Sequence, residues 1–148
     1  MKKYVLVACV IAIIGWGVGG VIDKVALNTM PGMSPLAAQF FRFSVATVAL
    51  WICGLFTGFY GEVGRLSRRA WLYIVLSGFF GVGVGGATYL YAVQLGEVSK
   101  VAVFSSGYPV LTVFLAVPFL GEKLTWNKVV GTLMVVGGLM ILSLSGAA

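Results

Sequence analysis

The sequence predicts an all-α polytopic membrane protein with five transmembrane helices. Hydrophobic residues make up 60% of its 148 residues and charged residues only 9%, whereas ordinary globular domains carry about 25% charged residues. Apolar stretches near 20 residues recur along the chain, and that length suits a helix crossing a hydrocarbon core of about 30 Å. Short alternating strands, which a barrel would require, do not occur. Helices are therefore expected, because backbone groups in lipid must be satisfied within the segment.

The five predicted helices follow one another with short linkers, so consecutive helices should be antiparallel neighbours. The first begins like a secretory signal, with two lysines before an apolar run. That run continues to Ile22 without a small-residue cleavage site, so a retained helix is expected. The five segments form one domain over residues 1–148 and cover about 4–26, 35–59, 70–95, 99–120 and 126–144.

Local signals mark the ends of these helices. Ser34 followed by Pro35 is typical of an N-cap with proline in the first helical turn. Ser67 can cap the third helix in the same way, and Gly121 can close the fourth. The spacing of Gly54 and Gly58 is that of a small-residue pair, which most simply indicates close contact between helices.

Lysine and arginine are distributed unequally between the two predicted sides of the membrane. The side that holds the N-terminus carries seven of them: Lys2, Lys3, Arg65, Arg68, Arg69, Lys123 and Lys128. The opposite side carries Lys24 and Lys100, and Arg42 lies inside the second helix. Because cytoplasmic loops are enriched in these residues, the N-terminus is predicted to be cytoplasmic and the C-terminus outside.

The composition argues against several classes of function. The net charge of +6 arises from residues at the ends of apolar segments rather than from a basic stripe, so no nucleic-acid partner is expected. Cys9 and Cys53 lie in apolar segments and are interpreted as small hydrophobes. The chain has no histidine and no pairing of a nucleophile with a base. We therefore expect no enzymatic activity, no metal site and no cofactor.

Arg42 is the clearest functional candidate, because ionisable residues inside a membrane are costly. It lies seven residues after Pro35, about 10 Å along the helix, and Asp23 lies at a similar depth in the first helix. The simplest interpretation is an intramembrane ion pair between Asp23 and Arg42. Three roles for Arg42 remain open: a structural clamp between two helices, attraction of an anionic group of a substrate, or snorkelling of its charge to the outer surface.

Four of the predicted helices carry a stripe of small or mildly polar residues. Gln39 shares a face with Arg42, three residues away. Such stripes should turn inward in lipid, toward a cavity or toward one another in close packing. The stripes on the first, third and fourth helices are Trp16, Gly20 and Asp23; Gly81, Gly85 and Thr88 with Tyr89 beside them; and Ser105, Tyr108 and Thr112.

Pro109 lies near the middle of the fourth helix, about 15 Å from Ser99. Proline cannot donate a hydrogen bond to the carbonyl of Ser105, so the helix should bend there. Transporters place binding sites at interrupted helices near the midplane. A harmless kink is the alternative interpretation.

Two long stretches resemble one EamA-type half of the drug/metabolite transporter superfamily: "GWGVGGVIDKVAL…MSPLAAQFFRF" and "GEVSKVAVFSSGYPVLTVFLAVPFLGEKLTWNKVVGTLMVVGGLMIL". The resemblance covers essentially the whole chain and depends on the order and spacing of its features. They are Trp16-Gly17, the 35–43 stretch, the 96–102 stretch, Pro109, Leu120-Gly121-Glu122, and Gly131 with Gly137-Gly138.

This resemblance implies one half of an inverted-repeat transporter fold. It implies a multi-pass transporter of small metabolites in the plasma membrane, often an exporter, whose larger members have two five-helix halves in inverted orientation. The fifth helix would lie outside the cavity, which the first, third and fourth helices line. Carried onto this chain, and joined with the polar faces above, the substrate pathway comprises Trp16, Gln39, Arg42, Tyr89, Ser105, Tyr108, Pro109 and Thr112.

One departure from related multidrug transporters concerns coupling. Those proteins carry a membrane-buried glutamate in the first helix, whereas positions 4–22 here contain no acid. The resemblance therefore does not extend to proton coupling or to the export of cationic drugs.

Five helices amount to half a transporter, so an assembly is expected, either a homodimer or a complex with a separately encoded inverted five-helix partner. The unequal charge distribution predicts a fixed orientation. The alternative function is a non-transporting membrane subunit that supports a partner or handles a lipid carrier. A transporter half should contain an internal polar cavity reaching Pro109, whereas a scaffold should be packed solid by its glycines.

Overall fold

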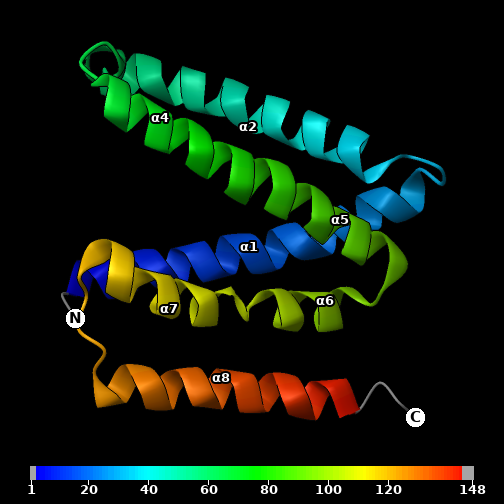
Figure 1. The fold of residues 1–148 in the computed structure, drawn as a ribbon. Helices are drawn as coiled ribbons and strands as arrows, with labels where there is room; N and C mark the ends of the chain where they lie inside the picture. The colour runs from blue at the N-terminus through cyan, green and yellow to red at the C-terminus, as the bar shows by residue number, and fades with distance from the viewer. Residues whose placement is uncertain (1–2, 145–148) are drawn as a thin grey trace. The chain divides into compact units, whose positions relative to one another are not determined.

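The computed structural model describes residues 3–144, which form helices joined by short turns (Figure 1). Residues 1–2 and 145–148 of the predicted domain, including Lys2 of the charge count, lie outside the described residues. Five helical stretches are long and apolar enough to cross a membrane, which confirms the predicted all-α, five-span fold. They are Lys3–Thr29, Pro35–Thr57, Arg68–Leu95, Val98–Leu120 and Trp126–Leu144.

Most large apolar side chains of these helices face outward rather than into a core. Leu90 and Val93 are almost completely buried, with 1% and 0% of their surfaces exposed, whereas Phe56 and Phe119 are highly exposed. An apolar exterior of this extent would be unfavourable in water. It suits a protein whose solvent is lipid.

The chain divides into two compact units, each described here by itself. The central unit is Val21–Leu95, and the terminal unit combines the described residues 3–20 and 96–144. The helix α1 (Lys3–Thr29) contributes residues to both. The central unit also holds α2 (Pro35–Thr57), α3 (Tyr60–Val63), α4 (Arg68–Ser77), the π-helix η1 (Gly78–Gly85) and α5 (Gly86–Leu95). The terminal unit also holds α6 (Val98–Ser105), α7 (Tyr108–Leu120) and α8 (Trp126–Leu144).

The bounds of α2 follow from its caps. The Ser34 side chain accepts a hydrogen bond from the Ala37 amide at 3.2 Å, so the predicted N-cap is confirmed. At the other end Gly58 adopts a left-handed conformation with φ of 70°, and its N–H donates to the Gly54 carbonyl at 2.9 Å. Only glycine adopts this conformation without strain. The helix therefore ends at Thr57 rather than near residue 59.

Gly54 serves the turn after α2 rather than a contact between two long helices. A Cβ at Gly54 would lie 2.5 Å from the Phe59 ring and 2.8 Å from the Tyr60 ring. The Tyr60 hydroxyl donates to the Trp51 carbonyl, so the aromatic turn folds back onto α2. The Gly54/Gly58 spacing, which was interpreted as a sign of contact between helices, is thus explained by this turn.

The third span contains a π-helix that was not predicted from the sequence. Ser67 caps α4 by accepting from the Ala70 amide at 3.2 Å, as expected. The segment GFFGVGVG then forms η1 before α5 resumes α-helical bonding. Glycine and β-branched valine both have weak α-helix propensity, which favours this departure. The prediction that Gly81, Gly85 and Thr88 share one face assumed α-helical spacing, and between Gly78 and Gly85 the bonding is π-helical instead.

The fourth span is broken where a bend at Pro109 was predicted. The helix α6 ends at Ser105, residues 106–107 form a turn, and α7 begins with Pro109 in its first helical turn. Proline is well tolerated there because the amides of the first turn have no helical partner. The predicted C-cap at Gly121 is confirmed by its left-handed φ of 65°.

Candidate functional site

The central unit contains an ion pair between α1 and α2. Arg42 Nη1 lies 2.8 Å from Asp23 Oδ2. The Asp23 side chain is 14% exposed and the Arg42 side chain 41% exposed. The carboxylate is therefore largely enclosed, while part of the guanidinium remains open. The structure thus brings together the two residues that were predicted to face each other.

Tyr89 of α5 lies within the range over which the charges of Asp23 and Arg42 act. Arg42 also approaches the Phe43 ring, with 6.0 Å from the guanidinium carbon to the ring centroid. That distance is at the limit for a cation–π interaction.

Lys24, next to Asp23, binds the end of α5. Its Nζ donates to the Val93 carbonyl at 2.7 Å and to the Gln94 carbonyl at 3.4 Å. A cation suits a helix C-terminus, where the last carbonyls have no helical partner. From the sequence, Lys24 was expected only as a charge on the outer side of the membrane. Its position directly after an intramembrane acid was the signal that could have identified this role.

Gln94 adds a further cross-link, because its Nε2 donates to the Met33 carbonyl at 3.2 Å. The bond ties α5 to the connection that leads into α2. Gln94 was not predicted, although it is a rare polar residue in an apolar segment.

Gln39 is a buried polar residue of α2, with 6% of its surface exposed. Its Nε2 donates to the Val82 carbonyl, inside η1, at 2.8 Å. A Cβ at Gly86 would overlap the Gln39 amide, so glycine is needed for this close approach. Among residues 3–144, none donates a hydrogen bond to Gln39 Oε1.

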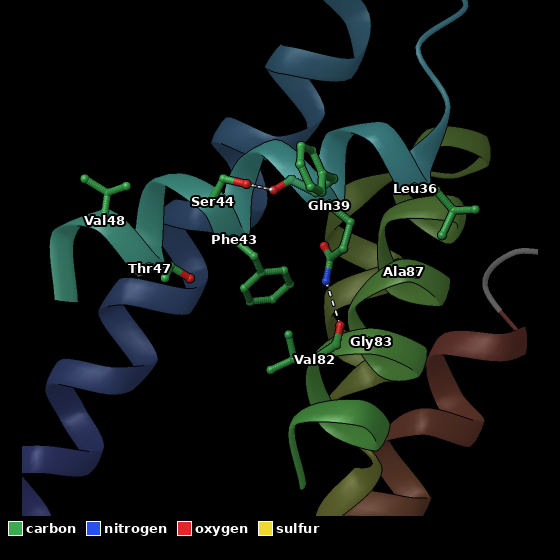
Figure 2. Close-up of a pocket in the computed structure, with 10 residues that line it drawn as sticks. Leu36, Gln39, Phe43, Ser44, Thr47, Val48, Val82, Gly83 and Ala87 are labelled. Atoms are coloured by element: carbon green, nitrogen blue, oxygen red, sulfur yellow. Dashed lines mark hydrogen bonds between the residues drawn. The ribbon is translucent and has the colours of Figure 1, made fainter. Parts of the chain in front are cut away.

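An open groove of about 650 Å³ lies beside Gln39, between α2 and the η1–α5 segment (Figure 2). Its walls are mainly apolar, and the Ser44 hydroxyl on one wall donates to the Phe40 carbonyl at 2.8 Å. This groove was not predicted from the sequence. Two adjacent rows with a spacing of four residues could have indicated it: Leu36, Phe40, Ser44 and Val48, and Gln39, Phe43 and Thr47. Opposite these rows lie Val82, Gly83 and Ala87.

The remaining predicted pathway residues lie in the terminal unit. Ser105 ends α6, and Tyr108 and Pro109 begin α7, so these three gather around the break in the fourth span. Thr112 donates to the Tyr108 carbonyl at 3.1 Å and lines a smaller groove of about 320 Å³ on α7. Trp16 is an exposed residue of α1 in the same unit. The predicted pathway therefore divides into one set of residues in each unit.

Comparisons with known proteins agree with this architecture. The family model described as the EamA-like transporter family matches residues 2–144. An uncharacterized transporter of Bacillus subtilis, YetK, is 28% identical over 99% of this chain and 42% of its own length. An uncharacterized protein of Methanocaldococcus jannaschii is 26% identical over 98% of this chain and 99% of its own length. No solved structure gives a significant match.

A protein of Rickettsia bellii named S-adenosylmethionine uptake transporter is 27% identical over 86% of this chain and 44% of its own length. The chain thus spans less than half the length of this relative and of the Bacillus one. The family match covers all of the described residues, and the five apolar spans agree with it. The chain therefore belongs to the EamA-like transporter family, whose members are multi-pass membrane transporters and not enzymes.

Proposed function

We propose that the chain is a five-helix half of a transporter that moves small metabolites across the plasma membrane, with export as the expected direction. Membership of the EamA-like family supports the transport function. The observation that carries the proposal is the Asp23–Arg42 pair, which places charge inside two apolar spans. Ionisable residues at such positions mark substrate or ion pathways in membrane proteins.

The exposure of Arg42 suggests how the pair contributes. A guanidinium has five N–H donors, and Asp23 occupies part of them at 2.8 Å. The remaining donors can bind an anionic group of a substrate while Asp23 keeps the side chain oriented. The proposed pathway also includes the other predicted residues: Trp16, Gln39, Tyr89, Ser105, Tyr108, Pro109 and Thr112.

An inverted-repeat transporter needs a second half. The Bacillus and Rickettsia relatives are more than twice as long as the part that this chain matches, whereas the Methanocaldococcus relative has nearly the same extent. We therefore propose that the chain acts as a homodimer or with an inverted five-helix partner. Its lysines and arginines favour one orientation, with the N-terminus cytoplasmic and the C-terminus outside.

Topology is the first test of this assembly. Two reporters are fused after Ala148, one active only in the cytoplasm and one active only outside. A signal from the outside reporter alone supports a fixed orientation and an inverted partner. Signals from both reporters support dual topology and an antiparallel homodimer, whereas a signal from the inside reporter alone contradicts the proposed orientation.

Transport itself is tested in proteoliposomes made with the full chain and any partner that co-purifies. The vesicles are loaded with a defined mixture of amino acids, nucleosides and S-adenosylmethionine. The last compound is included because the Rickettsia relative is named as its uptake transporter. Mass spectrometry of the external medium should show faster release of one solute, lost in Arg42→Gln. Lys100→Gln is the matched control, because it removes an exposed ion pair with Glu97. Release that is unchanged in Arg42→Gln would contradict the role of the ion pair. A protein that is a strict monomer after solubilisation and still moves substrate after reconstitution would contradict the proposed assembly.

A further inference from the structure

We propose that the groove beside Gln39 binds a small, uncharged and largely apolar molecule that donates one hydrogen bond to Gln39 Oε1. The groove lies between α2 and the η1–α5 segment, entirely within the central unit. As a statement about substrate class, the inference rests on the proposed transport function. As a statement about binding, it can be tested without transport.

The orientation of the Gln39 amide identifies the group that is available to a ligand. The Val82 carbonyl can only accept a hydrogen bond, so the nitrogen of the amide must face it, as the distance of 2.8 Å shows. The oxygen is then directed elsewhere, and no donor from residues 3–144 reaches it. Buried polar atoms of this kind are nearly always hydrogen-bonded, because an unpaired acceptor is costly. A ligand of this site is therefore expected to donate an N–H or O–H group to Gln39 Oε1.

The walls of the groove restrict what can bring that donor. Phe40, Phe43 and Val82 line the groove with apolar surface, and no lining residue is charged. Figure 2 shows Phe43 and Val82 on its two sides. A charged ligand would gain no counter-charge there and would lose its hydration. An uncharged molecule with an aromatic or aliphatic body and one N–H or O–H group matches this combination.

Two other occupants of a lipid-facing groove fit less well. The acyl chain of a lipid has no N–H or O–H group to offer the Gln39 oxygen. A helix from another protein uses its backbone amides internally, so it could reach the oxygen only with a side-chain donor such as a hydroxyl or an indole N–H. Phe43 is half-buried and lines the same groove as Gln39, so its ring is a candidate to move when a ligand approaches the covered oxygen.

Two nearly isosteric probes test the hydrogen bond. Indole carries an N–H donor, and 1-benzofuran replaces that group with an oxygen that cannot donate. Equilibrium binding of each labelled probe to the purified full chain in lipid nanodiscs is compared with binding to empty nanodiscs. One hydrogen bond predicts that indole binds about three- to tenfold more tightly. Equal affinity of the two probes would overturn the proposal and leave the groove to lipid chains.

Substitutions at two glycines of η1 test whether the probe binds in the groove. Gly83 lines the groove, and a Cβ there would have a single neighbour within 4 Å, the Gly78 carbonyl at 3.9 Å. A Cβ at Gly81 would have none, and Gly81 does not line the groove. Gly83→Leu should fill the groove and reduce indole binding at least tenfold, whereas Gly81→Leu should leave it unchanged. Equal binding to both variants would place the probe elsewhere and overturn the proposal.

Gln39→Met removes the acceptor while keeping an apolar side chain of similar length. In this variant the preference for indole over 1-benzofuran should disappear, and a retained preference would overturn the role of Gln39. If Gln39→Met fails to fold, two experiments still decide the proposal. They are the comparison of indole with 1-benzofuran on the wild-type chain and the comparison of Gly83→Leu with Gly81→Leu. Groove-dependent binding in a protein that releases no solute from proteoliposomes would contradict the transport function alone. Transport without groove-dependent binding would contradict this inference alone.

Discussion

The two units of the molecule use polar side chains differently. In the central unit, side-chain hydrogen bonds join residues far apart in sequence: Arg42 with Asp23, Gln39 with Val82, Gln94 with Met33, and Lys24 with Val93. In the described part of the terminal unit, the hydrogen bonds made by Lys100, Ser106, Thr112, Lys128 and Ser143 join residues three to six positions apart.

This difference bears on what holds each unit together. In lipid, apolar helices gain little by packing against one another, so association depends on close contact and on interhelical hydrogen bonds. The central unit has such bonds between its helices. In the terminal unit, Gly107 illustrates close contact instead, because a Cβ there would lie 2.9 Å from the Leu139 side chain of α8. Removing a polar group should therefore cost far more in the central unit.

The largest effect is expected from Asp23→Asn. The change leaves the Arg42 charge without its partner between two membrane-spanning helices, and we expect it to lower the free energy of unfolding by about 2–3 kcal/mol. SDS or heat denaturation in lipid bicelles measures the change. The double variant Asp23→Asn/Arg42→Gln should recover most of the loss, because it removes the unpaired charge. Equal stability of Asp23→Asn and wild type would show that the pair does not hold the unit together.

The next effect concerns the contact between α2 and the third span. Gly86→Ala places a methyl group where the Gln39 amide lies, so the bond to Val82 should break at a cost of about 1–3 kcal/mol. Gly78→Ala is the matched control, since a Cβ there has no neighbour within 4 Å. The free energy of unfolding of Gly78→Ala should stay the same or rise by up to about 1 kcal/mol, because alanine has a higher helix propensity than glycine. A similar loss in both variants would trace the effect to the helix backbone of the third span and not to Gln39.

A smaller effect is expected at the end of α5. Lys24→Met removes the cation from the Val93 and Gln94 carbonyls, at an expected cost of about 1–2 kcal/mol. Lys100→Met, in the terminal unit, removes an exposed pair with Glu97 and should cost less than about 1 kcal/mol. Amide hydrogen exchange at residues 90–95 should rise in Lys24→Met. Unchanged protection there would contradict the capping role.

The smallest effect is expected for Glu122→Gln in the terminal unit. The pair with Lys128 is short, at 2.6 Å, but the Lys128 side chain is 36% exposed and the Glu122 side chain 48% exposed, so neither charge is enclosed. Surface pairs of this kind contribute about 0–1 kcal/mol and are screened by salt. We therefore expect a loss below about 0.5 kcal/mol, measured by denaturation, that disappears at high salt. A loss as large as that of Lys24→Met would remove the contrast between the two units.

Some parts of the site could be predicted from single residues and others could not. Asp23 and Arg42 stand out because charges are rare in apolar spans, and their similar depth was enough to suggest a pair. The role of Lys24 depends on the end of α5 arriving beside it, 69 residues later in the chain. The groove depends on η1, whose π-helical bonding changes which side chains share a face.

The sequence by itself determined the solvent, the number of spans and most of their ends, because these depend on apolar length and on local caps such as Ser34, Ser67 and Gly121. It also indicated the family, because motif order and spacing are properties of the chain. Only the tertiary structure decided that Gln39 meets the Val82 carbonyl and that Gly86 makes room for it. It also decided that Lys24 caps α5. Such contacts join residues distant along the chain, and the packing of helices, rather than local propensity, brings those residues within hydrogen-bond distance.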